Sequence, residues 1–148
     1  VAGGLELGRI NIAARGAGMA KGATKMALHY AMERKTFGKA IAEHQAIQLK
    51  LAEMSTRAAA AELLVSQAAA KYDHQERCDL EAGQAKFFAS EAAVQNSLDA
   101  MRVFGGYSYS PEYEIERFYR DAPLLCIGEG TNEIQRMIIA KQMVARAS

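Results

Sequence analysis

The sequence predicts an all-α fold, specifically an up-and-down four-helix bundle with one additional short helix. Only two prolines occur among the 148 residues, and both lie late in the chain. Half of the residues are hydrophobic, and alanine, the strongest helix former, is abundant. Apolar residues recur at steps of three and four along three long stretches, which is the spacing that buries one face of a helix. Long helices with short connections pack as an antiparallel bundle.

The first long helix is expected over residues 5–33, which contain no proline. Its interior glycines each cost up to about 1 kcal/mol relative to alanine. Close approach of a neighbouring helix or of a ligand should offset that cost, and helix packing is the plainer explanation. These glycines are Gly8, Gly16, Gly18 and Gly22.

Two more long helices are expected to follow. A turn at Phe37-Gly38 separates the first helix from a second one over residues 43–74. A polar connection comes next, and Asp79 is a candidate N-cap for the third helix. That helix should end near Phe104, because Gly105-Gly106 stops it.

The last third of the chain contains weaker helix signals. Ser110-Pro111 predicts an N-cap followed by proline at the first helical position, and this short helix should end near Arg120. The segment 121–130 is expected to be extended or loop-like. Thr131 is a good N-cap for the last helix. The residues of that helix expected to face inward are Ile134, Met137, Ile138 and Met143.

Composition excludes several classes of function. A formal net charge of +1 argues against nucleic acid or an anionic membrane as the main partner. Neither the two cysteines nor the three histidines have the spacing of metal ligands, so we expect no metal site. No apolar run approaches the roughly 20 residues that cross a bilayer, and no signal peptide is recognisable. Because the chain begins without methionine, we expect a fragment of a longer protein.

Two loops could bind a ligand. The segment ERKTFGK places Arg34, Lys35 and Lys39 around Phe37. An arginine can bind a phosphate through paired hydrogen bonds, although a solvated charge run at a helix end is the plainer explanation. The glycines of VFGGYSY would let a ligand approach the backbone, and a helix stop explains them equally well.

A third loop could carry a catalytic base. Glu129 lies between Gly128 and Gly130, just before the Thr131 cap. Taken alone, a carboxylate here is most simply an anion that the helix dipole stabilises by about 0.3–1 kcal/mol. The flanking glycines, however, remove side-chain bulk and leave the carboxylate open to a ligand, as a general base requires.

The three loops together are far more specific than any one of them. The segments ERKTFGKAI and EHQAIQLKLAEM, then MRVFGGYSYSPEYEIERFYRDA, then IGEGTNEIQRMIIAKQM occur in this order and at these separations. The pattern resembles the acyl-CoA dehydrogenase family, in its C-terminal helical domain. The likeness extends over residues 5–143.

The resemblance implies a domain organisation, a cofactor and a reaction. Members of the family have an N-terminal helical domain and a middle β-domain ahead of the C-terminal bundle, so residues 1–148 are expected to be the last domain, inactive by itself. FAD lies between the last two domains and reaches a neighbouring subunit of a homodimer or homotetramer. The implied reaction is α,β-desaturation of an acyl-CoA thioester, with an electron-transfer flavoprotein as acceptor. The implied location is the bacterial cytoplasm or the mitochondrial matrix.

The resemblance also implies roles for single residues. Glu129 matches the glutamate that removes the α-proton while hydride leaves the β-carbon for the flavin. Arg9 and Gly130 match positions near the substrate. The residues that match FAD-binding positions are Arg34, Thr36, Phe37, His44, Gln45, Arg102, Gly105, Gly106, Thr131 and Glu133.

Three positions separate this sequence from many members of the family. Arg102 stands where many have glutamine, and a cation there can still serve a pyrophosphate. Some relatives carry the base on the first helix, at the position of Gly8, which has no side chain that could act. That leaves Glu129. Gly128 stands where many have tyrosine, so the pocket beside the base should accept a branched or bulky acyl group.

Two alternatives remain open. An acyl-CoA oxidase or another flavoenzyme of the same superfamily would share the fold, and production of hydrogen peroxide would distinguish an oxidase. A non-catalytic helical oligomerisation module would fit the composition and periodicity, and it would be colourless.

Overall fold

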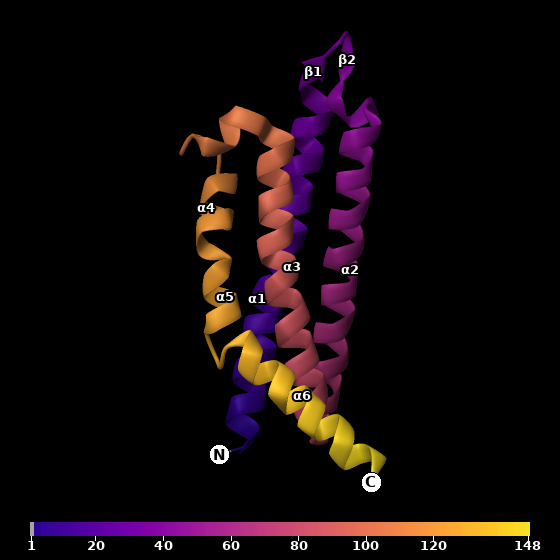
Figure 1. Ribbon diagram of the computed structural model, residues 1–148, viewed down its shortest axis with the longest axis vertical. Helices are drawn as coiled ribbons and strands as arrows, with labels where there is room; N and C mark the ends of the chain where they lie inside the picture. The colour runs from indigo at the N-terminus through magenta and orange to yellow at the C-terminus, as the bar shows by residue number, and fades with distance from the viewer. Residues whose placement is uncertain (1) are drawn as a thin grey trace.

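Three long helices, each antiparallel to the next along the chain, form the body of the molecule in the computed structural model, which describes residues 2–148 (Figure 1). They are α1 (Ala2–Glu33), α2 (Gln45–Asp73) and α3 (Asp79–Phe104). Helix α3 is central, because it contacts α1, α2 and each of the three helices that follow it. The bounds of the long helices agree with the expected spans to within a few residues. Within residues 2–148, no helix has the length and hydrophobicity that crossing a bilayer requires.

Small side chains allow the long helices to pack closely. Ten of the twelve buried residues in the largest apolar cluster are alanines between Ala13 and Ala92. The backbones of α1 and α3 approach most clearly at Gly16, where a Cβ would lie 2.7 Å from the carbonyl carbon of Ala89. Helix packing therefore accounts for this glycine. A Cβ at Gly18 would meet nothing within 4 Å, so no close contact offsets its cost.

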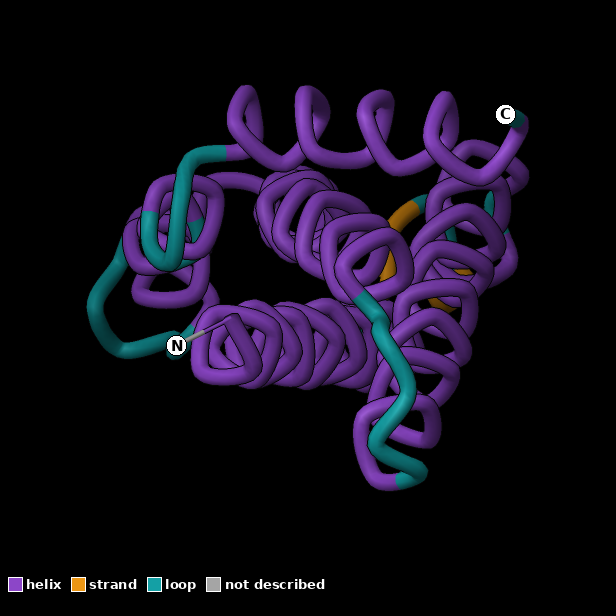
Figure 2. Tube along the Cα trace, turned by 90° about the horizontal axis from the view of Figure 1, so that it is seen from below, coloured by secondary structure: helices purple, strands orange, loops and turns teal. Residues whose placement is uncertain are grey.

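The last three helices complete the bundle. They are α4 (Ile115–Asp121), α5 (Pro123–Ile127) and α6 (Asn132–Ala147). Helices α4 and α5 form a column beside α3 and run back along it, whereas α6 crosses the bundle obliquely at the end farthest from the β1–β2 hairpin (Figures 1 and 2). The all-α bundle class is confirmed.

A β-hairpin separates α1 from α2. Its strands are β1 (Lys35–Thr36) and β2 (Lys39–Ala40), which pair antiparallel, and the short 3₁₀ helix η1 (Ile41–Glu43) follows. Phe37 and Gly38 occupy the turn with φ of 53° and 81°. Two positive φ angles are typical of the tight turns that suit the twist of a hairpin, and glycine adopts them without strain. The expected turn is confirmed, while the two short strands were not expected.

The predicted N-cap of α3 is wrong. Asp79 is the first residue of the helix, and the cap position belongs to Cys78, whose side chain makes no capping hydrogen bond. The Asp79 carboxylate instead pairs with the guanidinium groups of Arg77 at 3.2 Å and Arg9 at 3.6 Å. The two guanidinium groups bind this carboxylate, and it makes no hydrogen bond to the helix amides as a cap would.

Two expectations for residues 110–130 are also wrong. The Ser110 hydroxyl accepts a hydrogen bond from the Glu112 amide at 3.3 Å, which stabilises a turn, and helix α4 begins only at Ile115. The segment expected to be extended contains α5, which begins with Pro123. Proline suits the first helical turn because its missing N–H is not needed there.

The inward face of α6 was predicted incorrectly. Met137 and Met143 are 68% and 57% exposed, Ile134 is also exposed, and only Ile138 is half-buried. The buried residues of this helix are Asn132 and Gln135. Helix α6 crosses the bundle instead of lying along it, and one of its sides reaches α3, from Asn132 and Gln135 through Ile139, which lies against Gly83, to Arg146, which pairs with Glu81. The fully buried residues of that side are polar.

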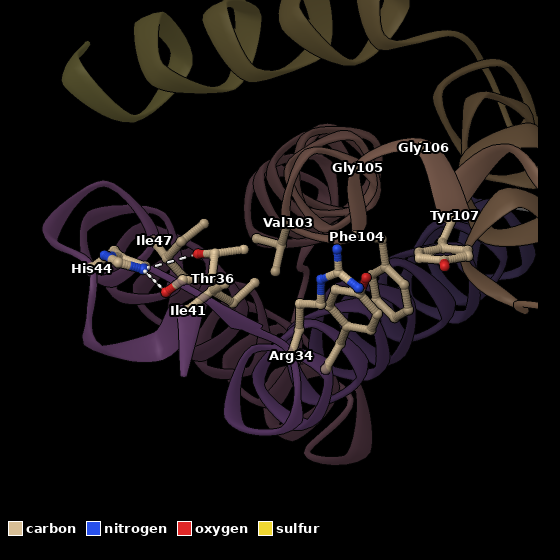
Figure 3. Close-up of a pocket in the computed structure, with 11 residues that line it drawn as sticks. Arg34, Thr36, Ile41, His44, Ile47, Val103, Phe104, Gly105, Gly106 and Tyr107 are labelled. Carbon is tan, nitrogen blue, oxygen red and sulfur yellow. Dashed lines mark hydrogen bonds between the residues drawn. The ribbon is translucent and has the colours of Figure 1, made fainter. Parts of the chain in front are cut away.

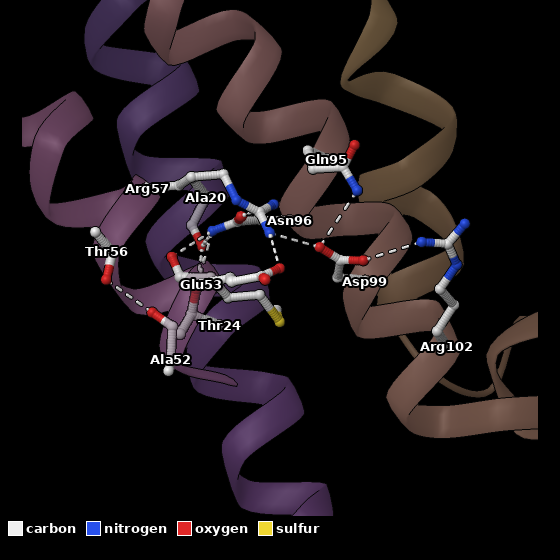
Figure 4. A network of polar contacts seen from close by, with 11 residues as sticks. Ala20, Thr24, Ala52, Glu53, Thr56, Arg57, Gln95, Asn96, Asp99 and Arg102 are labelled. Carbon is white, nitrogen blue, oxygen red and sulfur yellow. Dashed lines mark hydrogen bonds and ion pairs between the residues drawn. The ribbon is translucent and has the colours of Figure 1, made fainter. Parts of the chain in front are cut away.

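A buried polar network joins the three long helices (Figure 4). The Asn96 amide nitrogen donates to the Met54 carbonyl at 2.8 Å and to the Ala20 carbonyl at 3.2 Å. Arg57 donates to the Asn96 side-chain oxygen and to the Asp99 carboxylate, both at 2.7 Å. Burial is the largest single effect on the Asp99 carboxyl and would raise its pKa. The hydrogen bonds from Arg57 and Gln95 and the charge of Arg57 act together in the opposite direction, and they leave the pKa of Asp99 below its ordinary value. The network therefore sets the register of all three helices.

Acid is expected to weaken the attachment of α6. Glu81 accepts hydrogen bonds from Arg146 at 2.8 and 3.0 Å and from Lys71 at 2.7 Å. The hydrogen bonds from Arg146 are the main effect on the pKa of Glu81, and they lower it. Burial raises the pKa and the Lys71 contact lowers it further, so that it lies at about 2. A carboxyl with a lowered pKa stabilises the fold above its unfolded pKa of about 4.3, and this stability is lost as the pH falls from about 5 towards 2.

Since Arg146 is 43% exposed, solvent screening reduces the effect. We expect the free energy of unfolding to fall by about 1 kcal/mol between pH 6 and pH 3 on account of this group. Urea unfolding at the two pH values should show a smaller loss in Glu81→Gln than in the parent. An equal loss in both would exclude Glu81 as a source of the acid sensitivity.

Candidate active site

A cavity of about 610 Å³ lies beneath the β1–β2 hairpin, between the end of α1 and the end of α3 (Figure 3). It is lined by Tyr30, Arg34, Thr36, Ile41, His44, Ile47, Val103, Phe104, Gly105, Gly106 and Tyr107. Five of the predicted FAD-binding residues are among them, namely Arg34, Thr36, His44, Gly105 and Gly106. The fold thus brings two distant segments of the sequence together in one site.

The polar groups of this cavity suit an anion. Arg34 supplies a permanent positive charge, and its guanidinium carbon lies 5.8 Å from the centre of the Tyr107 ring. The His44 ring nitrogen Nε2 and the Thr36 hydroxyl are 3.0 Å apart and hydrogen-bonded, which orients both side chains. Gly105 has a φ of 65°, and a Cβ there would meet nothing within 4 Å. A phosphate could therefore approach both the guanidinium and the open glycine backbone.

The aromatic wall of the same cavity suits a planar ring. Tyr30 and Phe104 stack with ring centres 4.2 Å apart, and Tyr113 meets Phe104 edge-on. Burial, partly opposed by the charge of Arg34, raises the pKa of Tyr30. The cavity therefore combines the Arg34 guanidinium, the open backbone at Gly105-Gly106 (the glycine corner) and an aromatic surface. This combination fits a dinucleotide such as FAD. The aromatic residues were not predicted as site residues, since their spacing fits a helix core equally well.

The loop that precedes α6 holds Glu129 in an unusual backbone conformation. Its φ is 56°, in the left-handed region that residues other than glycine rarely adopt, and this costs about 1–3 kcal/mol. The following Gly130 has a φ of 85°. Thr131 is confirmed as the N-cap of α6, because its hydroxyl accepts from the Ile134 amide at 3.4 Å. The fully buried Gln135 donates from Nε2 to the carbonyls of Glu129 and Gly130, each at 3.2 Å.

The carboxylate of Glu129 lies against the backbone of α1 at Gly8. A Cβ on Gly8 would be 2.5 Å from one carboxylate oxygen of Glu129 and 2.9 Å from its carboxyl carbon. The two positions at which relatives are expected to carry the base are therefore neighbours in space. The side chain is exposed and accessible, but it is turned towards α1.

Residues 1–144 match the family described as "Acyl-CoA dehydrogenase, C-terminal domain". The chain is 49% identical over 140 residues to an acyl-CoA dehydrogenase of Bacillus subtilis, covering 95% of this chain and 37% of that protein. It is 42% identical over 142 residues to the caffeyl-CoA reductase-Etf complex subunit CarC of Acetobacterium woodii, covering 96% and 38%. The butyryl-CoA dehydrogenase structure from Megasphaera elsdenii superposes with a TM-score of 0.93 at 39% identity, covering 95% and 37%.

The chain belongs to the acyl-CoA dehydrogenase family. This confirms the resemblance that the three loop segments predicted, and with it a flavoprotein oxidoreductase family. The chain spans 37–38% of the length of these three relatives.

The acyl-CoA dehydrogenase domain presents its two candidate sites at opposite ends of the bundle. Gly8 contacts Glu129 near the start of α1, whereas Arg34 directly follows the end of that helix. At about 1.5 Å per residue, the 25 residues from Gly8 to Glu33 (33 − 8) span about 38 Å. Within one chain, Glu129 and Arg34 therefore do not share a cleft. The possibility that they meet within the same copy is excluded.

Several predicted residues lie outside the cavity. Phe37 projects from the hairpin tip, is 97% exposed and meets the His44 ring edge-on at 6.1 Å. Gln45 is exposed at the first position of α2. The Arg102 guanidinium is held by Asp99 at 3.2 Å (Figure 4).

The remaining predicted residues are Arg9, next to Gly8 on α1, and Gly130 and Glu133, close to Glu129 in the sequence. Arg9 is buried, and two of its guanidinium nitrogens have no hydrogen-bond partner, although one lies 3.6 Å from Asp79. Glu133 is exposed, and hydrogen bonds from its own backbone N–H and the Thr131 hydroxyl hold its pKa below the ordinary value. A Cβ on Gly130 would lie 2.9 Å from the Gln135 amide nitrogen, so a larger residue would displace that contact.

Sequence reasoning missed the fully buried Lys86 of α3. Its ammonium donates to the Cys126 carbonyl at 3.2 Å and to the Asn132 side-chain oxygen at 2.8 Å. Burial lowers its pKa, against the opposite effect of nearby anionic groups. The one available signal was its spacing: Lys86 is four residues after Ala82, on the apolar face of the predicted helix.

Replacing Gly8 with alanine should impair the proton abstraction predicted for Glu129, without loss of stability. The new Cβ would displace the Glu129 carboxylate, which is the free end of a flexible side chain and moves easily. A misplacement of about 1 Å can lower a rate about 100-fold. We expect the rate of flavin bleaching by substrate in the full-length enzyme to fall about 10- to 100-fold, with an unchanged or higher melting temperature. Gly18→Ala, where no atom lies within 4 Å, serves as the control.

Proposed function

We propose that this chain is the C-terminal domain of an FAD-dependent acyl-CoA dehydrogenase in which Glu129 removes the α-proton of an acyl-CoA thioester. The observation that supports this most directly is the presentation of Glu129, in a left-handed conformation with its carboxylate against Gly8. A carboxylate on a strained backbone, left accessible by the flanking glycines, fits the role of a general base. The residues that precede this chain in its relatives would then supply an N-terminal helical domain and a middle β-domain.

In the proposed reaction, the Glu129 carboxylate binds the α-proton, and the electron pair of that C–H bond forms the new α,β double bond. FAD, when bound, accepts the β-hydrogen as hydride. Negative charge develops on the thioester carbonyl as the proton leaves, and we assign the backbone N–H of Glu129 to that oxygen. Gly130, which follows Glu129 in the sequence, and Arg9, which follows Gly8 on α1, are proposed to support the substrate.

We propose that each chain serves two FAD molecules. Arg34, with Thr36, His44 and the Gly105-Gly106 corner, would hold the pyrophosphate and nucleotide end of one FAD. Further contacts to the same FAD would come from the rim of the cavity, from Phe37, Gln45 and Arg102. Thr131 and Glu133 would contact the other FAD beside the base. A homodimer or homotetramer follows, because a distance of about 38 Å separates the two ends of α1.

The acyl group is proposed to be branched or bulky. A Cβ on Gly128 would lie 3.4 Å from the Leu124 carbonyl oxygen and 3.9 Å from Ile12, so the absence of a side chain leaves room between α1 and the base loop. The relative from Acetobacterium woodii is named for caffeyl-CoA, which has a bulky acyl group, and for an Etf complex. We accordingly propose an electron-transfer flavoprotein as acceptor, in the bacterial cytoplasm or the mitochondrial matrix.

Purified full-length protein should be yellow, and titration with acyl-CoA thioesters should bleach the flavin absorbance. Cyclic, aryl or branched thioesters are expected to bleach it faster than butyryl-CoA. Strict preference for short straight chains would contradict the assignment of Gly128. The 148-residue chain alone should hold FAD weakly or not at all, and a stoichiometric yellow fragment would contradict the proposed division of the site.

The same measurements distinguish the two alternatives. Rapid production of hydrogen peroxide, with no transfer to an electron-transfer flavoprotein, would identify an acyl-CoA oxidase. A colourless full-length protein that does not bind FAD would identify a non-catalytic helical module.

A further inference from the structure

Lys86 is a buried cation for which neither the core nor the proposed FAD contacts provide a role. Its side chain is fully buried on α3, among alanines that pack against α1 and α2. A buried ammonium is costly unless several hydrogen bonds compensate for the loss of water. Its hydrogen-bond acceptors lie at the two ends of one segment, Cys126 near the end of α5 and Asn132 at the start of α6.

These acceptors are placed symmetrically about Glu129. Cys126, which supplies its carbonyl, lies three residues before Glu129, and Asn132, which supplies its side-chain oxygen, lies three residues after it. One ammonium group therefore joins both ends of the loop that carries the carboxylate. A loop pinned at both ends to α3 has little freedom to relax the left-handed backbone between them.

Asn132 extends the connection beyond Lys86. Its Nδ2 donates to the Glu91 carboxylate at 2.7 Å and to the Ser90 hydroxyl at 3.0 Å. The amide is thus fixed by α3 on one side and presents its oxygen to Lys86 on the other. Because Asn132 is also the first residue of α6, the same contacts fix where that helix begins.

We propose that Lys86 and Asn132 form a positioning pair that holds the Glu129 loop in its reactive conformation. The proposal rests on Glu129 being the base. Neither residue touches the carboxylate, so both act through the backbone of residues 126–132. Gln135, which donates to the carbonyls of Glu129 and Gly130, supports the middle of the same loop.

The decisive variants are Lys86→Met and Asn132→Ala in the full-length enzyme. Methionine fills a similar volume without the donors, and alanine removes the acceptor. We expect the rate constant for flavin bleaching at saturating substrate to fall about 10- to 100-fold in each, with the half-saturating substrate concentration changed less than about threefold. The double variant should lose no more than the worse single variant, because both changes release one loop. Lys86→Arg, which keeps donors, should recover part of the rate.

Hydrogen exchange provides a readout that does not depend on turnover. The Gly128 amide donates to the Leu124 carbonyl at 2.9 Å, so it reports whether the loop stays closed. In Lys86→Met we expect this amide to exchange at least about tenfold faster. Lys71→Met is the matched control, because Lys71 is a half-buried lysine that pairs with Glu81 away from the loop. Its exchange at Gly128 and its bleaching rate should equal those of the parent.

Each outcome decides one question. If Lys86→Met bleaches at the parental rate, or leaves exchange at Gly128 unchanged, the positioning pair is wrong. If Lys71→Met slows bleaching as much as Lys86→Met, the loss comes from general destabilisation and the proposal also fails. Normal turnover by Glu129→Gln would overturn the assignment of the base itself, and that result is independent of Lys86.

Discussion

Glu129→Gln in the full-length enzyme is expected to lower the rate of flavin bleaching by substrate about 10³-fold, with FAD still bound at full occupancy. Glutamine has nearly the same shape and can occupy the same space against Gly8. Its amide, however, cannot accept a proton from carbon at a useful rate. The change therefore removes the proposed proton acceptor and leaves the geometry of the loop.

The measurement is rapid-mixing absorbance with a saturating acyl-CoA. Glu116→Gln is the matched control, because Glu116 is a half-buried carboxylate on α4 that pairs with the exposed Arg120 at 3.2 Å. It should bleach at the parental rate. Parental bleaching by Glu129→Gln would rule out Glu129 as the base.

Arg57→Met is expected to give the largest loss of stability, about 3 kcal/mol in the free energy of unfolding. Arg57 donates to Asn96 and Asp99, both at 2.7 Å, and the Asp99 side chain is only 5% exposed. Removing the guanidinium leaves a buried carboxylate with weaker partners, Gln95 at 3.3 Å and Arg102 at 3.2 Å. Leaving a buried charge incompletely paired is one of the more costly single changes in a protein.

Urea unfolding followed by circular dichroism would measure this loss. Lys21→Met is the control, because it also removes an ion pair between helices, to Glu62 at 3.2 Å, but there the side chains are 69% and 58% exposed. An exposed pair contributes about 0–1 kcal/mol. If the two variants lose equal stability, the buried network does not hold the long helices together.

Two of the wrong expectations share one physical cause. The Asp79 cap, the inward face of α6 and the extended segment before Glu129 were all predicted from neighbours in the sequence. For the cap and for α6 a contact with a distant residue prevails, whereas α5 forms because Pro123 suits its first turn. Arg9 of α1 takes part in binding Asp79, and the crossing angle of α6 decides which of its sides reaches α3.

The sequence by itself determined the helical class, the three long spans, the hairpin turn at Phe37-Gly38 and the Thr131 cap. These depend on periodicity and on local backbone chemistry, which act within a few residues. Its loop segments also determined the family. Only the tertiary structure decided that Gly8 and Glu129 are in contact, that Lys86 donates hydrogen bonds to both Cys126 and Asn132, and that the Arg34 cavity lies at the opposite end of α1. Such relations depend on how helices pack side by side, and no local pattern encodes which residues then meet.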